Sequence, residues 1–109
     1  MVTYNQTMRI IAKSRLKKYW ETPGNEHLKS YLSEWYHFCE KQIWRTPQEV
    51  KDTLRNASII ASNRVIFNIK GNDYRIICAM DYPRLAMFIK FVGTHKEYDR
   101  VNASEVEND

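Results

Sequence analysis

Hydrophobic and polar positions in the first part of the chain predict a strand followed by a helix. Residues 8–12 form a short, partly β-branched run that is typical of a strand, and Ser14 follows as a candidate helix N-cap. We therefore expect a short basic helix over residues 15–20. The sequence TPGN at residues 22–25 ends that helix, and its Asn25 can cap the next one.

The longest helical pattern covers residues 26–43, where apolar residues recur at steps of three and four. We assign this stripe to the core rather than to an interface with another protein. It comprises Leu28, Leu32, Trp35, Cys39 and Ile43, widened by Tyr31 and Phe38. A further short helix is expected next, because Thr46 and Glu49 form a capping box, and it should end near Asn56.

The second half of the chain changes to the alternating period of β-strands. Two β-rich runs flank Gly71-Asn72, a pair that favours a tight hairpin turn. With that turn, Asn68 lies opposite Arg75, and one face of the hairpin is apolar. The other face carries Arg64, Asn68, Lys70 and Arg75.

A second turn is expected in the sequence YPRL, and it leads into a third strand of the same sheet. The simplest register places Lys90 opposite Ile77 and Val92 opposite Arg75. Lys90 then joins the polar face of the sheet, whereas Phe91 joins the apolar face.

These elements predict an α+β fold in which a small antiparallel sheet has helices packed on one face. We expect the first strand to join this sheet at an edge or in its centre. We divide the chain into an N-terminal extension (residues 1–7), one domain (residues 8–103) and an acidic flexible tail (residues 104–109). A single domain of this length can bury a sizeable core without disulfides.

The net charge of +4 is unevenly distributed along the chain. Residues 104–109 contain three acids and no base, which leaves residues 1–103 with 17 basic and ten acidic side chains. This excess favours a polyanionic partner, nucleic acid first. The alternative is that the charges serve solubility on exposed helix faces.

Several features favour a cytoplasmic protein. The longest apolar run is too short to span a membrane, and no secretory signal pattern opens the chain. Cys39 and Cys78 both lie within apolar periodicities, so we expect them to be buried free thiols in a reducing compartment.

The cations on the polar face of the sheet can bind phosphate oxygens. Arg75 beside Asn68 offers several hydrogen-bond donors, and Arg64 and Lys70 add positive charge. The alternative is a solvated sheet face on which Lys70 pairs with Asp73 across the hairpin turn.

The sequence GTHKEYD combines a helix start with a side chain that can move protons. Thr94 and Glu97 form a capping box, so a short helix should begin at His95. The N-terminus of a helix disfavours an added positive charge, which should help to keep His95 neutral near neutral pH. A neutral imidazole can accept a proton.

Two further side chains lie on the same face of this helix as His95. Tyr98 can stabilise or relay a proton, and Asp99 can orient the imidazole ring. Lys96 points elsewhere and can contact a second phosphate.

This set of residues matches the needs of RNA cleavage without a metal ion. A base takes the ribose 2′-OH proton, cations stabilise the phosphorane, and an acid protonates the leaving 5′-oxygen. Only RNA has the 2′-OH, so the substrate is expected to be RNA rather than DNA. No carboxylate cluster, Gly-rich loop or nucleophile motif is present, so we expect no metal or cofactor. A metal site at His37 and Cys39 is disfavoured because residues two apart point away from each other on a helix.

The segment NRVIFNIKGNDYRIICAMDY, followed by FIKFVGTHKEYD, resembles the HigB family of bacterial toxins within the RelE-like superfamily. The similarity runs from about Met8 to Arg100 and is densest over residues 63–99. It implies a compact α+β fold and an endoribonuclease that cleaves mRNA on the translating ribosome and inhibits translation and growth. It also implies a HigA-type helix-turn-helix antitoxin as partner, through which any DNA binding would be indirect.

The resemblance also implies roles for individual residues. His95 would be the general base or acid, Arg75 would stabilise the phosphorane, and Tyr98 would stack on substrate or handle a proton. Lys90 stands where many relatives have arginine, which keeps the charge but not the bidentate geometry. The predicted site consists of catalytic His95, Arg75 and Tyr98, RNA- and phosphate-binding Arg64, Asn68, Lys70, Lys90 and Lys96, and supporting Thr94, Glu97 and Asp99.

A second hypothesis is a non-catalytic RNA-binding or partner-binding domain on the same scaffold. The position of His95 distinguishes the two, because catalysis requires His95 and Arg75 to approach one phosphate-sized space. A DNA-binding regulator is a third possibility, but the sequence contains no helix-turn-helix pattern.

Overall fold

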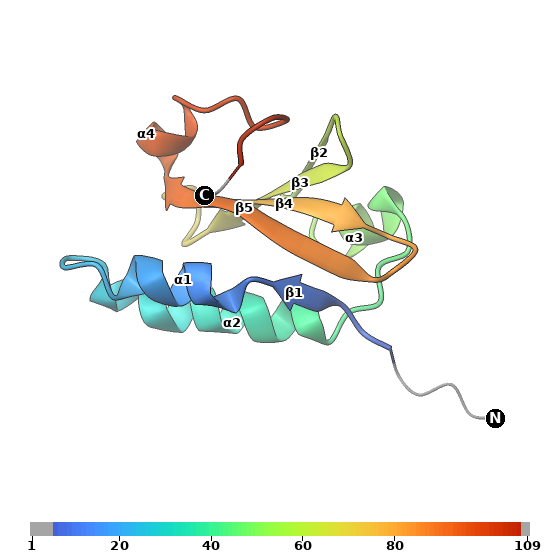
Figure 1. The fold of residues 1–109 in the computed structure, drawn as a ribbon, viewed down its shortest axis with the longest axis horizontal. Coiled ribbons are helices and arrows are strands. Elements are labelled where there is room, and N and C mark those ends of the chain that lie inside the picture. The colour runs from blue at the N-terminus through green and yellow to red at the C-terminus, as the bar shows by residue number, and fades with distance from the viewer. Residues whose placement is uncertain (1–5, 108–109) are drawn as a thin grey trace.

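A five-stranded mixed sheet forms the centre of the molecule, and two helices cover one of its faces (Figure 1). The computed structural model describes residues 6–107. The helical elements are α1 (Lys13–Trp20), the 3₁₀ turn η1 (Glu26–Leu28), α2 (Lys29–Glu40), α3 (Pro47–Thr53) and α4 (His95–Tyr98). The strands are β1 (Arg9–Ile11), β2 (Ser58–Ile60), β3 (Arg64–Ile69), β4 (Tyr74–Asp81) and β5 (Ala86–Thr94).

The strand order β1-β5-β4-β3-β2 confirms the predicted α+β fold and places the first strand at an edge. β1 runs parallel to β5, and all other neighbouring pairs are antiparallel. The sequence did not predict β2, because its three residues are too few to show an alternating pattern. Of the predicted N-terminal extension (residues 1–7), only residues 6 and 7 are among those described.

The hairpin between β3 and β4 has the predicted register. Asn68 pairs with Arg75 and Ile69 with Tyr74, on either side of a turn in which Gly71 has a φ of +65°. That left-handed conformation suits glycine, which has no Cβ to clash with the backbone. Arg64, Asn68 and Arg75 therefore lie on one face of the sheet, as the pattern predicted.

The register between β4 and β5 was predicted correctly for only half of its length. It holds from Asp81 to Cys78, and then a β-bulge near Lys90 shifts it by one residue. Phe91 rather than Lys90 pairs with Ile77. A bulge places two residues of one strand against one of its partner, so the side chains beyond it change faces relative to the simple register.

Beyond this bulge, two predictions are corrected. Val92 packs against the core, whereas we expected it opposite Arg75 on the polar face. Gly93 takes that position opposite Arg75. Phe91 was predicted for the apolar face, but it pairs with Ile77 and therefore lies on the polar face.

The core lies between the sheet and α2. Trp35 packs edge-on against Phe67 with ring centroids 5.2 Å apart, and Trp44 stacks on the same ring at 6.2 Å. Trp44 is buried although the predicted stripe did not include it. The prediction that the whole stripe belongs to the core is wrong for Tyr31, Phe38 and Ile43, whose side chains are exposed. For Ile43 the reason is that α2 ends at Glu40, so the helical period no longer applies.

The predicted helix boundaries are mostly confirmed, with different capping details. The Thr46 hydroxyl accepts a hydrogen bond from the Glu49 N–H at the start of α3. The Glu49 carboxylate accepts its bond from the Arg45 N–H, one residue before the position that a reciprocal box would use. Ser14 lies inside α1 rather than at its N-cap, and Asn25 precedes η1 without a side-chain capping bond.

Both cysteines are free and buried, as predicted. Burial raises the pKa of the Cys39 and Cys78 thiols, because a thiolate would lose its hydration in the core. Within residues 6–107, no helix is both long and apolar enough to cross a membrane.

The aromatic cluster around Phe67 should dominate the stability of the fold. Phe67→Ala should lower the free energy of unfolding by about 3–5 kcal/mol, because it leaves a cavity between Trp35 and Trp44. Phe38→Ala is the matched control and should cost less than about 1 kcal/mol, because this ring is exposed on α2. Urea denaturation measures both, and equal losses would contradict this description of the core.

Candidate active site

A capping box holds the helix α4 at the end of β5, as the sequence predicted. The Thr94 hydroxyl accepts a hydrogen bond from the Glu97 N–H at 3.1 Å, and Glu97 Oε1 accepts one from the Thr94 N–H at 2.8 Å. The His95 N–H donates to the Asp73 carbonyl at 2.9 Å. Hydrogen bonds to main-chain groups therefore connect α4 to the end of β5 and to the β3–β4 turn.

Two residues that the sequence reasoning did not select hold Glu97 in position. A Cβ at position 93 would lie 2.7 Å from Glu97 Oε1 and 2.6 Å from Phe91 Cζ, so only glycine leaves room for this carboxylate. The Tyr19 hydroxyl of α1 donates to the same oxygen at 3.3 Å. Burial, and then the nearby Glu97 charge, raises the pKa of Tyr19. The only sequence signal was Gly93 directly before the capping box.

His95 is half-exposed at the start of α4. Its Nδ1 lies 3.1 Å from Asp99 Oδ2, one turn further along the chain. A proton on Nδ1 satisfies that contact and leaves the Nε2 lone pair free to accept a proton. His95 and Lys96 line a depression of about 440 Å³ together with Asn72–Tyr74 and Thr94.

Arg75 lies against the ring of Tyr98. Its guanidinium carbon is 5.5 Å from the ring centroid, within the range of a cation–π contact. Its Nη1 donates to the Asn72 carbonyl at 2.7 Å. Its partner on β5 is Gly93, and the space over that glycine is taken by the Phe91 ring and the Glu97 carboxylate. Arg75 and His95 therefore lie at one corner of the sheet, where α4 meets β4 and β5, and Tyr98 on α4 links them. Arg75 does not line the depression beside His95.

Arg64 and Lys90 are on the same side of the sheet, but both contact the C-terminal segment. Glu107 lies 2.8 Å from Arg64 Nη2 and 2.7 Å from Lys90 Nζ. The bulge therefore leaves Lys90 on the predicted polar face. This face is less open than predicted, since Ile66 and Ile77 on it are buried.

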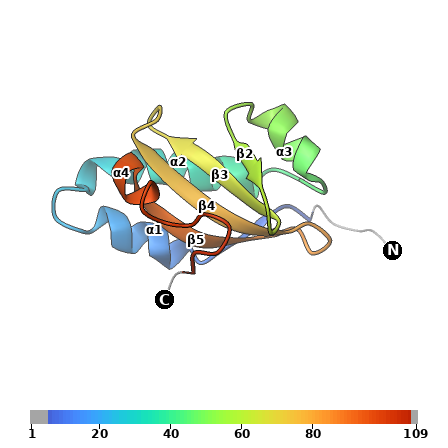
Figure 2. The same ribbon diagram turned by 90° about the horizontal axis from the view of Figure 1, so that it is seen from above.

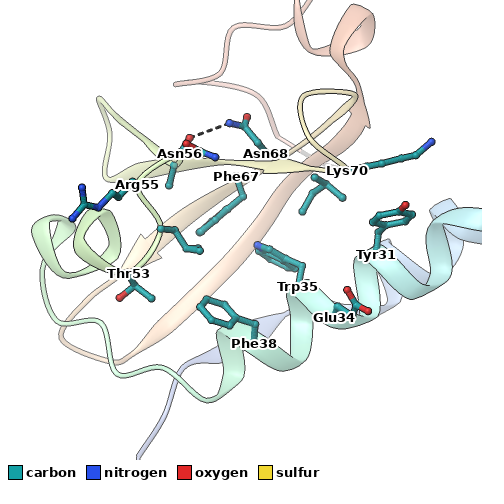
Figure 3. Close-up of a pocket in the computed structure, with 13 residues that line it drawn as sticks. Tyr31, Glu34, Trp35, Phe38, Thr53, Arg55, Asn56, Phe67, Asn68 and Lys70 are labelled. Carbon is teal, nitrogen blue, oxygen red and sulfur yellow. Dashed lines mark hydrogen bonds between the residues drawn. The ribbon is translucent and has the colours of Figure 1, made fainter.

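Asn68 and Lys70 lie at a different site, a cavity of about 600 Å³ between β3, α2 and the segment after α3 (Figure 3). Asn68 Nδ2 donates to the Asn56 carbonyl at 3.0 Å. Lys70 Nζ lies 6.0 Å from the Tyr31 ring centroid rather than beside Asp73. This cavity is lined by neither His95 nor Arg75.

The candidate metal ligands are also apart from this corner. His37 Nδ1 lies 2.8 Å from Glu40 Oε1, and Cys39 is buried on another side of α2. In the described part of the chain, no three His, Cys, Asp or Glu side chains are grouped in a way that could hold a metal ion.

The fold and the site define a small α+β domain in which a cationic sheet face adjoins a histidine, an arginine and a tyrosine. The chain belongs to the HigB_toxin family, described as the RelE-like toxic component of a toxin-antitoxin system, whose model matches residues 28–101. This confirms the resemblance seen in the sequence, and the matched segment includes every predicted site residue. Residues 8–27, which we had included in the similarity, lie outside the match. No curated protein matches the chain.

Gly93→Ala tests the close packing that holds α4. The added methyl group should displace the Glu97 carboxylate or the Phe91 ring and lower the free energy of unfolding by about 1–3 kcal/mol. Thr94→Ser is the matched control, because it keeps the capping hydroxyl and should change stability by less than about 0.5 kcal/mol. Thermal denaturation measures both, and an unaffected Gly93→Ala variant would show that α4 does not depend on this space.

Proposed function

We propose that this protein is the toxin of a type II toxin-antitoxin system and that it cleaves mRNA as an endoribonuclease that uses no metal ion. We further propose that it acts on the translating ribosome in the cytoplasm and thereby inhibits translation and growth. Membership of the HigB_toxin family supports the toxin role. The cleavage activity rests on the chemistry of the corner formed by α4, β4 and β5.

One observation supports the catalytic proposal, namely that Arg75 contacts Tyr98 on the same short helix that carries His95. His95 is exposed and paired with Asp99, while Arg75 is held against Tyr98 on the same short helix. These side chains belong to α4, to its C-cap and to the neighbouring strand β4, and those of His95 and Asp99 are at least half-exposed. A histidine beside an arginine is the minimum needed to move a proton and to stabilise a phosphorane.

The proposed reaction is an attack of the ribose 2′-oxygen on the adjacent phosphorus. His95 accepts the 2′-OH proton as general base or donates a proton to the leaving 5′-oxygen as general acid. Arg75 stabilises the negative charge of the phosphorane, and Tyr98 either stacks on a base or takes part in proton transfer. The P–O5′ bond breaks, and the product carries a 2′,3′-cyclic phosphate. Asp99 orients the imidazole of His95.

The remaining predicted residues are proposed to bind the RNA backbone at different distances from the reacting phosphate. Lys96 lines the depression beside His95 and is the closest candidate. Arg64 and Lys90 lie further along the same face of the sheet. Asn68 and Lys70 flank the separate cavity next to α2, where they would contact a part of the RNA further from the reacting phosphate. Thr94 and Glu97 support the site by capping α4.

Membership of a toxin-antitoxin family implies an antitoxin as partner. We propose that this antitoxin is of the HigA type, with a helix-turn-helix domain, and that the complex binds DNA through the antitoxin alone. The described part of the toxin has an excess of positive charge, which suits an acidic antitoxin segment as well as RNA.

The alternative proposal is a non-catalytic RNA-binding or partner-binding domain on the same scaffold. It differs in one measurable respect, because binding would then persist without strand cleavage. The assay below therefore follows both mRNA cleavage and mRNA binding.

His95→Ala and Arg75→Ala should each reduce mRNA cleavage by at least about a hundredfold during translation of a defined mRNA with purified protein. Primer extension on the recovered mRNA measures the cleavage. Arg75→Lys should recover part of the activity, because it keeps the charge but not the planar donors.

His37→Ala is the matched control, since His37 is exposed on α2 and pairs with Glu40 away from the corner. It should cleave like the wild type. Cleavage that survives in both His95→Ala and Arg75→Ala would reject this active site, and mRNA binding without cleavage by the wild type would favour the non-catalytic alternative.

A further inference from the structure

The C-terminal segment crosses the cationic face of the sheet, on the side opposite to α1 and α2 (Figures 1 and 2). Asn102 begins a turn there, in which the Val106 N–H donates to the Asn102 carbonyl at 2.8 Å. The Ser104 N–H and hydroxyl both bind the Asn102 side chain. Beyond this turn, Glu107 lies between Arg64 and Lys90.

Arg64 on β3 holds the main chain of this segment against the sheet. Its Nη1 donates to the Ala103 carbonyl at 3.1 Å and to the Val106 carbonyl at 2.6 Å. Arg64 is the one charged residue that is buried among those described, and its side chain is only 6% exposed. A buried guanidinium needs acceptors for its donors, and these two carbonyls supply them without adding a charge.

The Glu107 carboxylate occupies the outer part of the same site. It uses one oxygen for Arg64 Nη2 and the other for Lys90 Nζ. The Glu107 side chain is 57% exposed, so it can leave while the main-chain contacts of Arg64 stay in place. The hydrogen bond from Lys90 lowers the pKa of Glu107, because it favours the charged carboxylate.

A carboxylate that bridges an arginine and a lysine has the same recognition chemistry as a phosphodiester. Both present two oxygens and one unit of negative charge to the same donors. Exchange of one for the other therefore leaves the charge of the site unchanged. The Glu107 carboxylate is tethered to the protein, so it competes for the site at a high effective concentration. It supplies a single anionic group, whereas an RNA strand has a phosphate at every nucleotide and can bind at several places at once.

Arg64 and Lys90 are also placed where a single-stranded RNA that passes through the catalytic corner could reach them. Lys90 is at the bulge beside Ile77, and Arg64 pairs with Ala79, two and four residues along β4 from Arg75. At about 3.3 Å per residue, the far end is roughly 13 Å from Arg75. A few nucleotides of single-stranded RNA can span that length on the same face of the sheet.

We propose that Arg64 and Lys90 form a phosphate subsite for single-stranded RNA, and that Glu107 is its built-in occupant, which RNA displaces. The proposal rests on the RNA-directed function given above and adds a regulatory element to it. The C-terminal segment lowers the affinity of the free protein for RNA, and Glu107 leaves the subsite when an RNA phosphate takes its place.

The test compares Glu107→Gln with Glu105→Gln in the full chain. Both substitutions remove one negative charge from the same segment, but no ion pair involves the Glu105 side chain among the described contacts. Fluorescence anisotropy with a short labelled oligouridylate at fixed salt measures RNA affinity. Glu107→Gln should bind roughly two- to fivefold more tightly than Glu105→Gln, the range expected for release of an exposed ion pair. In a protein that already lacks the Lys90 charge, Glu107→Gln should give no gain, so Glu107→Gln/Lys90→Gln should bind the RNA no more tightly than Lys90→Gln.

Equal affinities of the two single variants, or a gain that persists in the double variant, would overturn the proposed subsite. Cleavage of mRNA is measured on the same proteins and separates the two claims. Histidine-dependent cleavage together with equal affinities would reject the subsite and leave the endoribonuclease function intact. Tighter binding by Glu107→Gln, with no cleavage by any protein, would reject the catalytic function and leave the subsite intact.

Discussion

The short helix α4 depends on the hydrogen bond between the Glu97 carboxylate and the Thr94 N–H. A helix of four residues has too few internal hydrogen bonds to persist alone, so its position is set by contacts with the rest of the fold. The same carboxylate oxygen meets Tyr19 of α1, and the missing side chain at Gly93 leaves space for it. Any group that α4 presents is therefore as rigid as the end of β5.

That rigidity matters because the candidate chemistry needs fixed distances. His95 and Tyr98 lie on α4, whereas Arg75 belongs to β4. The capped junction and the main-chain hydrogen bond from His95 to Asp73 hold α4 beside that strand. The β-bulge contributes in a second way, because it brings Gly93 rather than Val92 opposite Arg75. The guanidinium thus lies across from a glycine whose open side is filled by Phe91 and Glu97, and it contacts the Tyr98 ring.

Much of this arrangement could be predicted from the sequence, because it depends on local patterns. The β3–β4 hairpin follows from alternation around Gly71-Asn72, and the start of α4 follows from the spacing of Thr94 and Glu97. The bulge could not be predicted, because the alternation around Lys90 and Phe91 contains no signal for an extra residue there.

The features that depend on distant contacts were also missed. Trp44 follows the end of α2 and is buried because it stacks on Phe67 and donates to Thr53 of α3, contacts that the helical period does not encode. The sequence suggested a flexible acidic tail, and its contact with Arg64 appears only once the sheet is formed. The division of the chain into extension, domain and tail stays a prediction.

The central claim is that the phosphate to be cleaved lies at the corner formed by α4 and β4. The most direct measurement is the structure of the protein bound to an RNA that carries a 2′-deoxy substitution at the nucleotide to be cleaved, which blocks the attacking hydroxyl. The account predicts the scissile phosphate within hydrogen-bonding distance of both the His95 imidazole and the Arg75 guanidinium. A scissile phosphate bound elsewhere, for example beside Asn68 and Lys70, with the His95 ring turned toward solvent, would contradict it.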